Sequence, residues 1–215
     1  MIGCLRRVGC LAVLLVLVAV AWFTRERWTS RMPFRARATP TGATWESSTA
    51  EGARRAESAI RRMQSSSGPV FVNVTAAELL AHVAPALTKA LPRSMDSIQA
   101  AVIGERLYLR ARVRIADLGG KAALGPLAAL LGERERVQLG GVLRVVRPGL
   151  LEFQVKEAAV RGLALPQGII PALIKQLARG ERPLDVSADG IPIVTPDYIG
   201  DVRVAGGRIT LYKRQ

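Results

Sequence analysis

The chain has 215 residues, a formal net charge of +14 at pH 7 and 49% hydrophobic residues. Its two cysteines, Cys4 and Cys10, lie near the N-terminus, and His82 is its single histidine. We therefore expect neither a disulfide framework nor a metal site made of thiolates and imidazoles. The excess of basic residues predicts an anionic partner, such as a lipid surface.

Residues 1–28 are expected to be an N-terminal signal anchor. Their uncharged run, Val8–Phe23, has arginines on both sides, and in hydrocarbon the backbone of such a run is satisfied only as a helix. The run continues past the signal-peptidase-like sequence Ala19-Val20-Ala21, which favours a retained single-pass anchor and leaves cleavage before Trp22 as the alternative. The short tail before the run favours export of the bulk of the chain to the extracytoplasmic side.

Residues 29–67 are expected to be a flexible basic linker, because they are rich in Ser, Thr, Pro and Arg and poor in large aliphatic residues. The stretch Thr49–Met63 also suits a short basic helix lying on the membrane surface. The run Ser65–Gly68 marks the expected boundary, and residues 68–215 are assigned to one exported domain.

The first helix of that domain is predicted to begin at a capping box, Thr75-x-x-Glu78. Apolar residues then recur at helical spacing, Pro85 predicts a kink, and Pro92 ends the helix. His82 follows Glu78 by four residues, so we expect the two side chains to pair.

The next element is a hairpin that turns at Gly104-Glu105. Its alternation opposes Val102 to Leu107, Ala100 to Leu109 and Ile98 to Ala111 on one face.

A short second helix is expected at about Ala122–Leu131. A second hairpin follows, for which a three-residue loop, Pro148–Leu150, would oppose Val145 to Phe153. A third hairpin turns at Gly206-Gly207, opposing Val204 to Ile209 and Val202 to Leu211.

A third helix beginning near Pro166 has the clearest apolar stripe of the chain. The order predicts three helix-plus-hairpin units, at about 75–116, 121–160 and 166–213. We therefore expect an α+β fold with a long curled antiparallel sheet, preceded by an N-terminal transmembrane helix.

This order resembles the bacterial membrane-anchored relatives of the tubular lipid-binding (TULIP-like) superfamily, of the LmeA and YpmS type. The resemblance rests on Val72–Leu79, the hairpin Ile98–Ile115, the helix entry Leu165-Pro166 and the final hairpin Asp201–Lys213. It implies a twisted sheet around a helix, with an apolar groove for acyl chains, and it carries over no catalytic residue.

Two sets of binding residues are predicted. The residues expected to line a lipid groove are Leu79, Val83, Leu87, Ile169, Ile170, Leu173, Ile174 and Leu177. The residues expected to contact anionic head groups are Arg106, Arg110, Arg112 and Arg114, which alternate with apolar residues and share the outward face of one strand. An ordinary solvated strand face is the alternative for these arginines.

The sequence holds no phosphate-binding glycine loop, nucleophile elbow or identifiable catalytic pair, so we expect no enzyme, no metal and no cofactor. Nucleic acid is disfavoured because Tyr108 is the only aromatic residue within the arginine-rich strand. The expected function is that of a membrane-tethered envelope protein that binds lipid acyl chains without catalysis. The alternative is an assembly or protein-interaction module of the envelope with a solid core.

Overall fold

The computed structural model describes residues 44–90, 92, 94–119, 131–177 and 182–214, with the side chains of residues 86–90 excepted. None of the helices in these ranges is both long and apolar enough to cross a membrane. The expected anchor at Val8–Phe23, the first part of the linker and most of the second helix lie outside the described residues.

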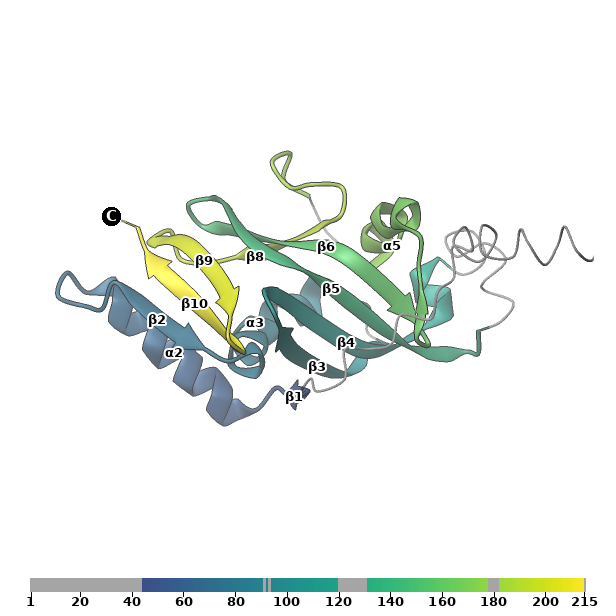
Figure 1. Cartoon of the computed structure of the whole chain (residues 1–215), viewed down its shortest axis with the longest axis horizontal. Coiled ribbons are helices and arrows are strands. Elements are labelled where there is room, and N and C mark those ends of the chain that lie inside the picture. Colours follow the sequence, from purple (N-terminus) through teal and green to yellow (C-terminus); the bar gives the residue numbers. More distant parts are fainter. Residues whose placement is uncertain (1–43, 91, 93, 120–130, 178–181, 215) are drawn as a thin grey trace, which may run out of the picture. The chain divides into compact units, whose positions relative to one another are not determined.

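The described elements follow one another in the order shown in Figure 1. The first half comprises β1 (Glu46–Ser47), α2 (Ala50–Gln64), β2 (Phe71–Val74), α3 (Ala76–Ala90), β3 (Asp96–Ile103), β4 (Arg106–Arg114) and the 3-10 helix η1 (Ile115–Leu118). The second half comprises β5 (Arg134–Arg147), β6 (Leu150–Val160), β7 (Leu163–Ala164), η3 (Gln167–Ile169), α5 (Ile170–Leu177), β8 (Gly190–Val194), β9 (Ile199–Ala205) and β10 (Arg208–Lys213).

The described strands form two sheets, and all their pairings are antiparallel. A seven-stranded sheet has the order β1-β3-β4-β5-β6-β7, with β8 also paired to β6, and a three-stranded sheet has the order β2-β10-β9. The α+β class is confirmed, but the expectation of one long sheet is wrong. The third hairpin pairs with β2, which places Ile209 opposite Val74 and Leu211 opposite Val72.

The core lies on the face of the large sheet that α3 and α5 cover. Buried residues of both helices and of strands β3 to β6 form one apolar cluster, and the small sheet contributes its buried face to the same cluster. This cluster includes four apolar residues of the predicted third-helix stripe, Ile170, Leu173, Ile174 and Leu177.

Two glycines in the middle of β5 allow the central strands to approach closely. A Cβ atom at Gly140 would lie 2.4 Å from the Tyr108 ring of β4, and one at Gly141 would lie 2.1 Å from the carbonyl oxygen of Gln154 in β6. The pairing of β5 with β6 shifts register between these two glycines. Side chains at either position would push the neighbouring strands apart.

Helix α2 corrects the expectation of a linker over 29–67, because residues 50–64 are helical and buried on one side. The Thr49 Oγ1 atom accepts a hydrogen bond from the Gly52 N–H group at 3.0 Å, which caps the helix. Ala56 and Met63 are fully buried against the domain. Since this apolar face packs against protein, it is not available to enter a membrane surface. The folded domain therefore begins upstream of Gly68.

Glu78 joins α2 to α3. The predicted capping box is confirmed, with Thr75 N–H donating to Glu78 Oε2 at 2.9 Å and Glu78 N–H donating to Thr75 Oγ1 at 3.2 Å. The other carboxylate oxygen accepts from Arg55 Nε of α2 at 2.8 Å. The expected partner of Glu78 was His82, so the structure corrects that expectation.

The first and third hairpins have the predicted turns, and the third has the predicted register. In the first hairpin, Val102 lies opposite Leu107 and Ala100 opposite Leu109, but a bulge near Ser97, whose φ is 54°, replaces the expected pairing of Ile98 with Ala111.

The second hairpin has a different register from the predicted one. A two-residue turn precedes Leu150, and a register shift between Val145 and Arg147 places Val145 opposite Leu151 and Leu143 opposite Phe153. The bulge is the physical reason, because one extra residue keeps the apolar side chains on one face with a shorter loop.

Replacing Met63 with Ala tests whether α2 belongs to the core. We expect a loss of about 2–5 kcal/mol in the free energy of unfolding, because Met63 is fully buried. Chemical denaturation of the full chain in uncharged detergent, followed by circular dichroism, measures it. Arg62→Ala is the matched control, since Arg62 is exposed on the same helix. Equal stability of the two variants would contradict the packing of α2.

Candidate functional site

An apolar pocket of about 70 Å³ lies between α3, the end of α5 and the inner face of the large sheet. Apart from Arg110, every described residue that lines it is apolar. These residues are Ala76, Leu79, Leu80, Val83, Met95, Ile98, Leu107, Leu109, Ala111, Val137, Leu139, Phe153, Leu177, Ile191 and Ile193. Because Arg110 is the single polar residue of this described lining, the pocket offers few hydrogen-bond partners that would hold water and favours an apolar guest.

The volume limits what this pocket can hold. An apolar cavity of about 150 Å³ is known to take up benzene, and the pocket has about half that space. It accommodates a few methylene groups rather than a whole acyl chain. Met95, Ile98, Leu109 and Ile193 line it and are only partly buried.

The structure divides the predicted groove residues into three groups. Leu79, Val83 and Leu177 line the pocket. Ile170, Leu173 and Ile174 are buried in the surrounding core without lining it, and Ile169 lies in η3, partly exposed. The side chain of Leu87 lies outside the described side chains. The sequence stripe thus identified an apolar face, while the lining residues of the strands were missed because their approach depends on tertiary packing.

The four arginines predicted to form a head-group ladder have different surroundings. Arg106 forms an ion pair with Glu157 of β6, and Arg114 Nε lies 3.5 Å from Asp117 Oδ2. These two charges are therefore compensated locally. Arg110 and Arg112 instead border a polar hollow of about 400 Å³ on the outer face of the sheet, together with Arg134, Glu135, Arg136, Gln138, Arg161 and Gly162.

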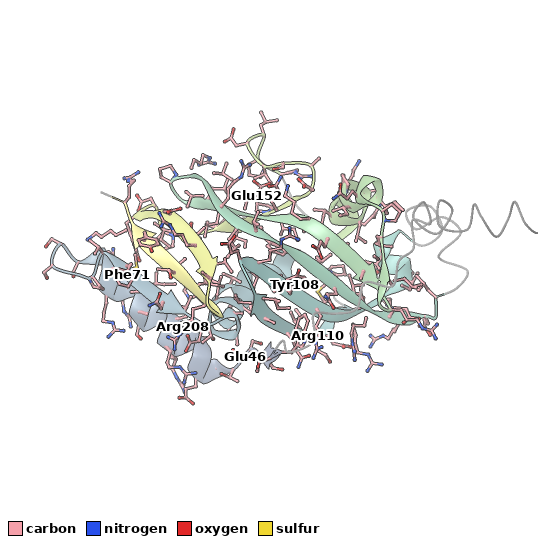
Figure 2. The ribbon with its side chains drawn as sticks, viewed as in Figure 1. Glu46, Phe71, Tyr108, Arg110, Glu152 and Arg208 are labelled. Carbon is pink, nitrogen blue, oxygen red and sulfur yellow. The ribbon has the colours of Figure 1, made fainter. Side chains whose placement is uncertain are left out.

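Tyr108 shares the outward face of β4 with these arginines but is buried, with 7% of its surface exposed. Its ring occupies the space over Gly140, which is its cross-strand partner. Figure 2 shows Tyr108 and Arg110 on the same part of the sheet. Because the ring already packs against protein, it offers no free face for stacking a nucleobase.

Arg110 is held in place by the segment that precedes α2. Its guanidinium carbon lies 4.1 Å from the centroid of the Trp45 ring, and its Nε atom donates a hydrogen bond to Gln99 Oε1 at 2.7 Å. Burial, and then the positive charge of Arg136, lower the pKa of the Arg110 guanidinium from its usual value. The terminal nitrogens of Arg110 have no described carboxylate partner within ion-pair distance.

Glu152 is a fully buried carboxylate, and buried ionisable groups mark many active sites. Its Oε2 atom accepts from Arg144 Nη2 at 2.7 Å and from Arg144 Nε at 3.0 Å, and its Oε1 atom accepts from the Ser187 N–H group at 2.9 Å. Burial by itself would raise the pKa of the Glu152 carboxyl, but the hydrogen bonds from Ser187 and Arg144 outweigh it and hold the pKa below its usual range. We interpret Glu152 as a structural clamp, a residue of β6 that binds Arg144 of β5 and the Ser187 backbone in the loop before β8.

Among the residues that the structure describes, no group of three His, Cys, Asp or Glu side chains is placed to hold a metal ion. No family model, no curated protein and no solved structure matches this chain.

Replacing Glu152 with Gln should lower the free energy of unfolding at pH 7 by about 1–3 kcal/mol, because a charge-assisted pair with Arg144 is lost. The folded-state pKa is depressed, so the stabilisation is present above the ordinary carboxyl pKa of about 4.3 and is lost as the pH falls through the folded value. Denaturation curves between pH 7 and pH 3 should show a weaker pH dependence for the variant.

Asp185→Asn is the control for this measurement, since Asp185 and its partner Arg147 are both largely exposed and such pairs contribute about 0–1 kcal/mol. Identical pH profiles for Glu152→Gln and the original chain would show that Glu152 is not a clamp.

Proposed function

We propose that this chain is a membrane-tethered envelope protein whose α+β domain binds the apolar end of a lipid without catalysing a reaction. The apolar pocket under α3 carries the proposal, because its described lining is apolar except for Arg110. The run Val8–Phe23 supplies the tether and places the domain beside a source of lipid. The resemblance to TULIP-like domains supports the same choice.

The size of the pocket determines which part of a lipid it takes. Burial of apolar surface stabilises a complex by about 0.8 kcal/mol per CH₂ group, so a few methylenes give weak binding on their own. We therefore expect the pocket to hold a chain terminus while the remainder of the lipid stays in the membrane or against the partly buried rim.

The same small volume favours a second function, an interaction or assembly module of the envelope with an essentially solid core. In that case the space under α3 is a packing void of about 70 Å³. The two proposals share a fold and differ in whether filling the space changes lipid binding.

Replacing Ala111 with Leu tests the pocket directly. Ala111 is buried and lines the pocket, so the larger side chain should occupy space that a lipid would use. Native mass spectrometry of the full chain, released from detergent micelles and supplied with phospholipid, should show at least a tenfold lower lipid-bound fraction for the variant. Ala205→Leu, an identical change at an exposed position of β9, should leave binding unchanged.

Lipid uptake by the original chain separates the two functions. If the space is only a packing void, the original chain should take up no lipid, and Ala111→Leu should therefore have no lipid-bound fraction to reduce. Such a clean apo mass for the original chain would favour the interaction module.

The tether generates a separate expectation. Intact mass spectrometry of the membrane-extracted protein should show a chain that retains residues 1–28, because the apolar run continues past Ala21. A mature chain that starts at Trp22 would contradict the retained anchor.

A further inference from the structure

The outer face of the large sheet carries five arginines around one hollow, which the proposed function does not use. Arg110 and Arg112 come from β4, Arg134 and Arg136 from β5, and Arg161 from the turn after β6. The strand register brings the first four together, because Arg110 lies opposite Gln138, Arg112 opposite Arg136 and Arg114 opposite Arg134. Sequence periodicity could not show this convergence.

The carboxylates at the hollow leave part of this charge uncompensated. Arg134 Nη1 lies 2.8 Å from Asp96 Oδ2, and Arg161 Nη1 lies 3.9 Å from Glu135 Oε1. Within the described ranges, neither Arg112 nor Arg136 forms an ion pair, although both side chains are exposed. Net positive charge is therefore concentrated at Arg110, Arg112 and Arg136.

This arrangement costs stability instead of supplying it. Like charges directly opposite each other on neighbouring strands are destabilising, and Arg112 and Arg136 are such a pair. Arg110 adds a third charge on the same face, two residues from Arg112 and so about 7 Å along the strand. A bound anion would offset the repulsion of all three groups.

Arg110 is also oriented in advance for a ligand. Its Nε atom donates a hydrogen bond to Gln99 Oε1, and Gln99 Nε2 in turn donates to Ser47 Oγ at 3.1 Å. The guanidinium carbon of Arg110 lies over the Trp45 ring. This support fixes the plane of the fork while leaving the two terminal nitrogens available, which reduces the entropy lost on binding.

We propose that the hollow bounded by Arg110, Arg112, Arg136 and Gln138 binds a phosphate monoester group. A phosphate monoester carries up to two negative charges and three equivalent oxygens, which match three guanidinium groups, and Gln138 adds an amide donor. A carboxylate has one charge and two oxygens and would leave part of the site unpaired. The hollow shares Arg110 with the lining of the apolar pocket, but Arg112, Arg136 and Gln138 lie outside that lining, so the phosphate site does not require the proposed lipid function.

The test measures phosphate binding by the full chain in uncharged maltoside detergent at about 50 mM salt. The probe is glycerol 3-phosphate, titrated by isothermal calorimetry, with glycerol as the uncharged control. The double variant Arg112→Gln, Arg136→Gln removes the uncompensated pair. Its matched control is Arg54→Gln, Arg62→Gln, which removes the same charge from exposed positions of α2.

We expect the original chain and the α2 control to bind glycerol 3-phosphate with dissociation constants within about twofold of each other. The Arg112/Arg136 double variant should bind at least tenfold more weakly, since a hydrogen bond to a charged group corresponds to roughly a tenfold factor or more. Equal weakening in both double variants would show a diffuse charge effect, and no binding by the original chain would equally overturn the site.

Thermal unfolding without ligand gives a second readout. The Arg112/Arg136 double variant should be at least as stable as the original chain, because a like-charge pair has been removed. If that variant does not fold, Arg112→Lys, Arg136→Lys keeps the charge and loses the paired donors of the guanidinium fork. Unchanged affinity in the Lys variant would overturn the proposed geometry.

The source of the phosphate is distinguished by a further probe. Dihexanoyl phosphatidate presents the same monoester on a lipid, and dihexanoyl phosphatidylcholine presents a phosphodiester with a compensating cation. Phosphatidate binding at least tenfold tighter than glycerol 3-phosphate would support a lipid head group, and equal affinity would support a free phosphate monoester. Either result with loss in the Arg112/Arg136 variant supports the site.

Discussion

The close approach of β4, β5 and β6 at Gly140 and Gly141 is the constraint on which the rest of the domain depends. On the outer face, Gly140 leaves room for the Tyr108 ring, which covers the sheet between the outward arginines. At Gly141 the backbone of β6 comes so close that a side chain would overlap Gln154. The register shift at this point sets which residues of β6 face the core, including Phe153 at the apolar pocket.

The two faces of these strands therefore have different roles. The inner face is apolar and covered by α3 and α5, with a small space left unfilled. The outer face carries several guanidinium groups. Ion pairs compensate the charges of Arg106 and Arg114, whereas Arg112 and Arg136 lie opposite each other without described ion pairs. Because successive residues of β4 point to opposite faces of the sheet, a change of strand register would disrupt both sites together.

Local rules predicted the local parts of this fold. The capping box at Thr75, the third hairpin and the buried stripe of α5 depend on residues close in sequence, and the structure has them. The same rules failed where tertiary packing determined which residues are buried and which turn is formed. Three of the five buried residues of α2 are Gly or Ala, so its burial could not be recognised from the sequence. The bulge near Val145 allowed a shorter turn to replace the predicted loop.

The candidate sites show the same division. Alternation along β4 placed the arginines on one face, but the partner of Arg106 is Glu157 of β6, and the residue opposite Arg112 is Arg136 of β5, each more than twenty residues away in sequence. No hairpin turn links Arg112 to Arg136, since residues 115–133 separate the two strands. The apolar pocket was likewise only partly predictable, because strands that are distant in sequence supply most of its lining.

The pairing of β2 with β10 has a consequence for the order in which the parts of the chain fold. Tyr212 lies opposite Phe71, and Tyr198 donates a hydrogen bond to the Ile60 carbonyl oxygen at 3.1 Å, so the last strands complete the structure around the first ones. Contacts this distant in sequence form late, because a long loop must close before they are made. A growing chain thus holds β2 without its strand partner, and α2 without its contact to Tyr198, until residues 198–213 emerge. A chain shortened before β9 would therefore leave the apolar side chains of β2 without the strands that bury them, and such surface favours aggregation.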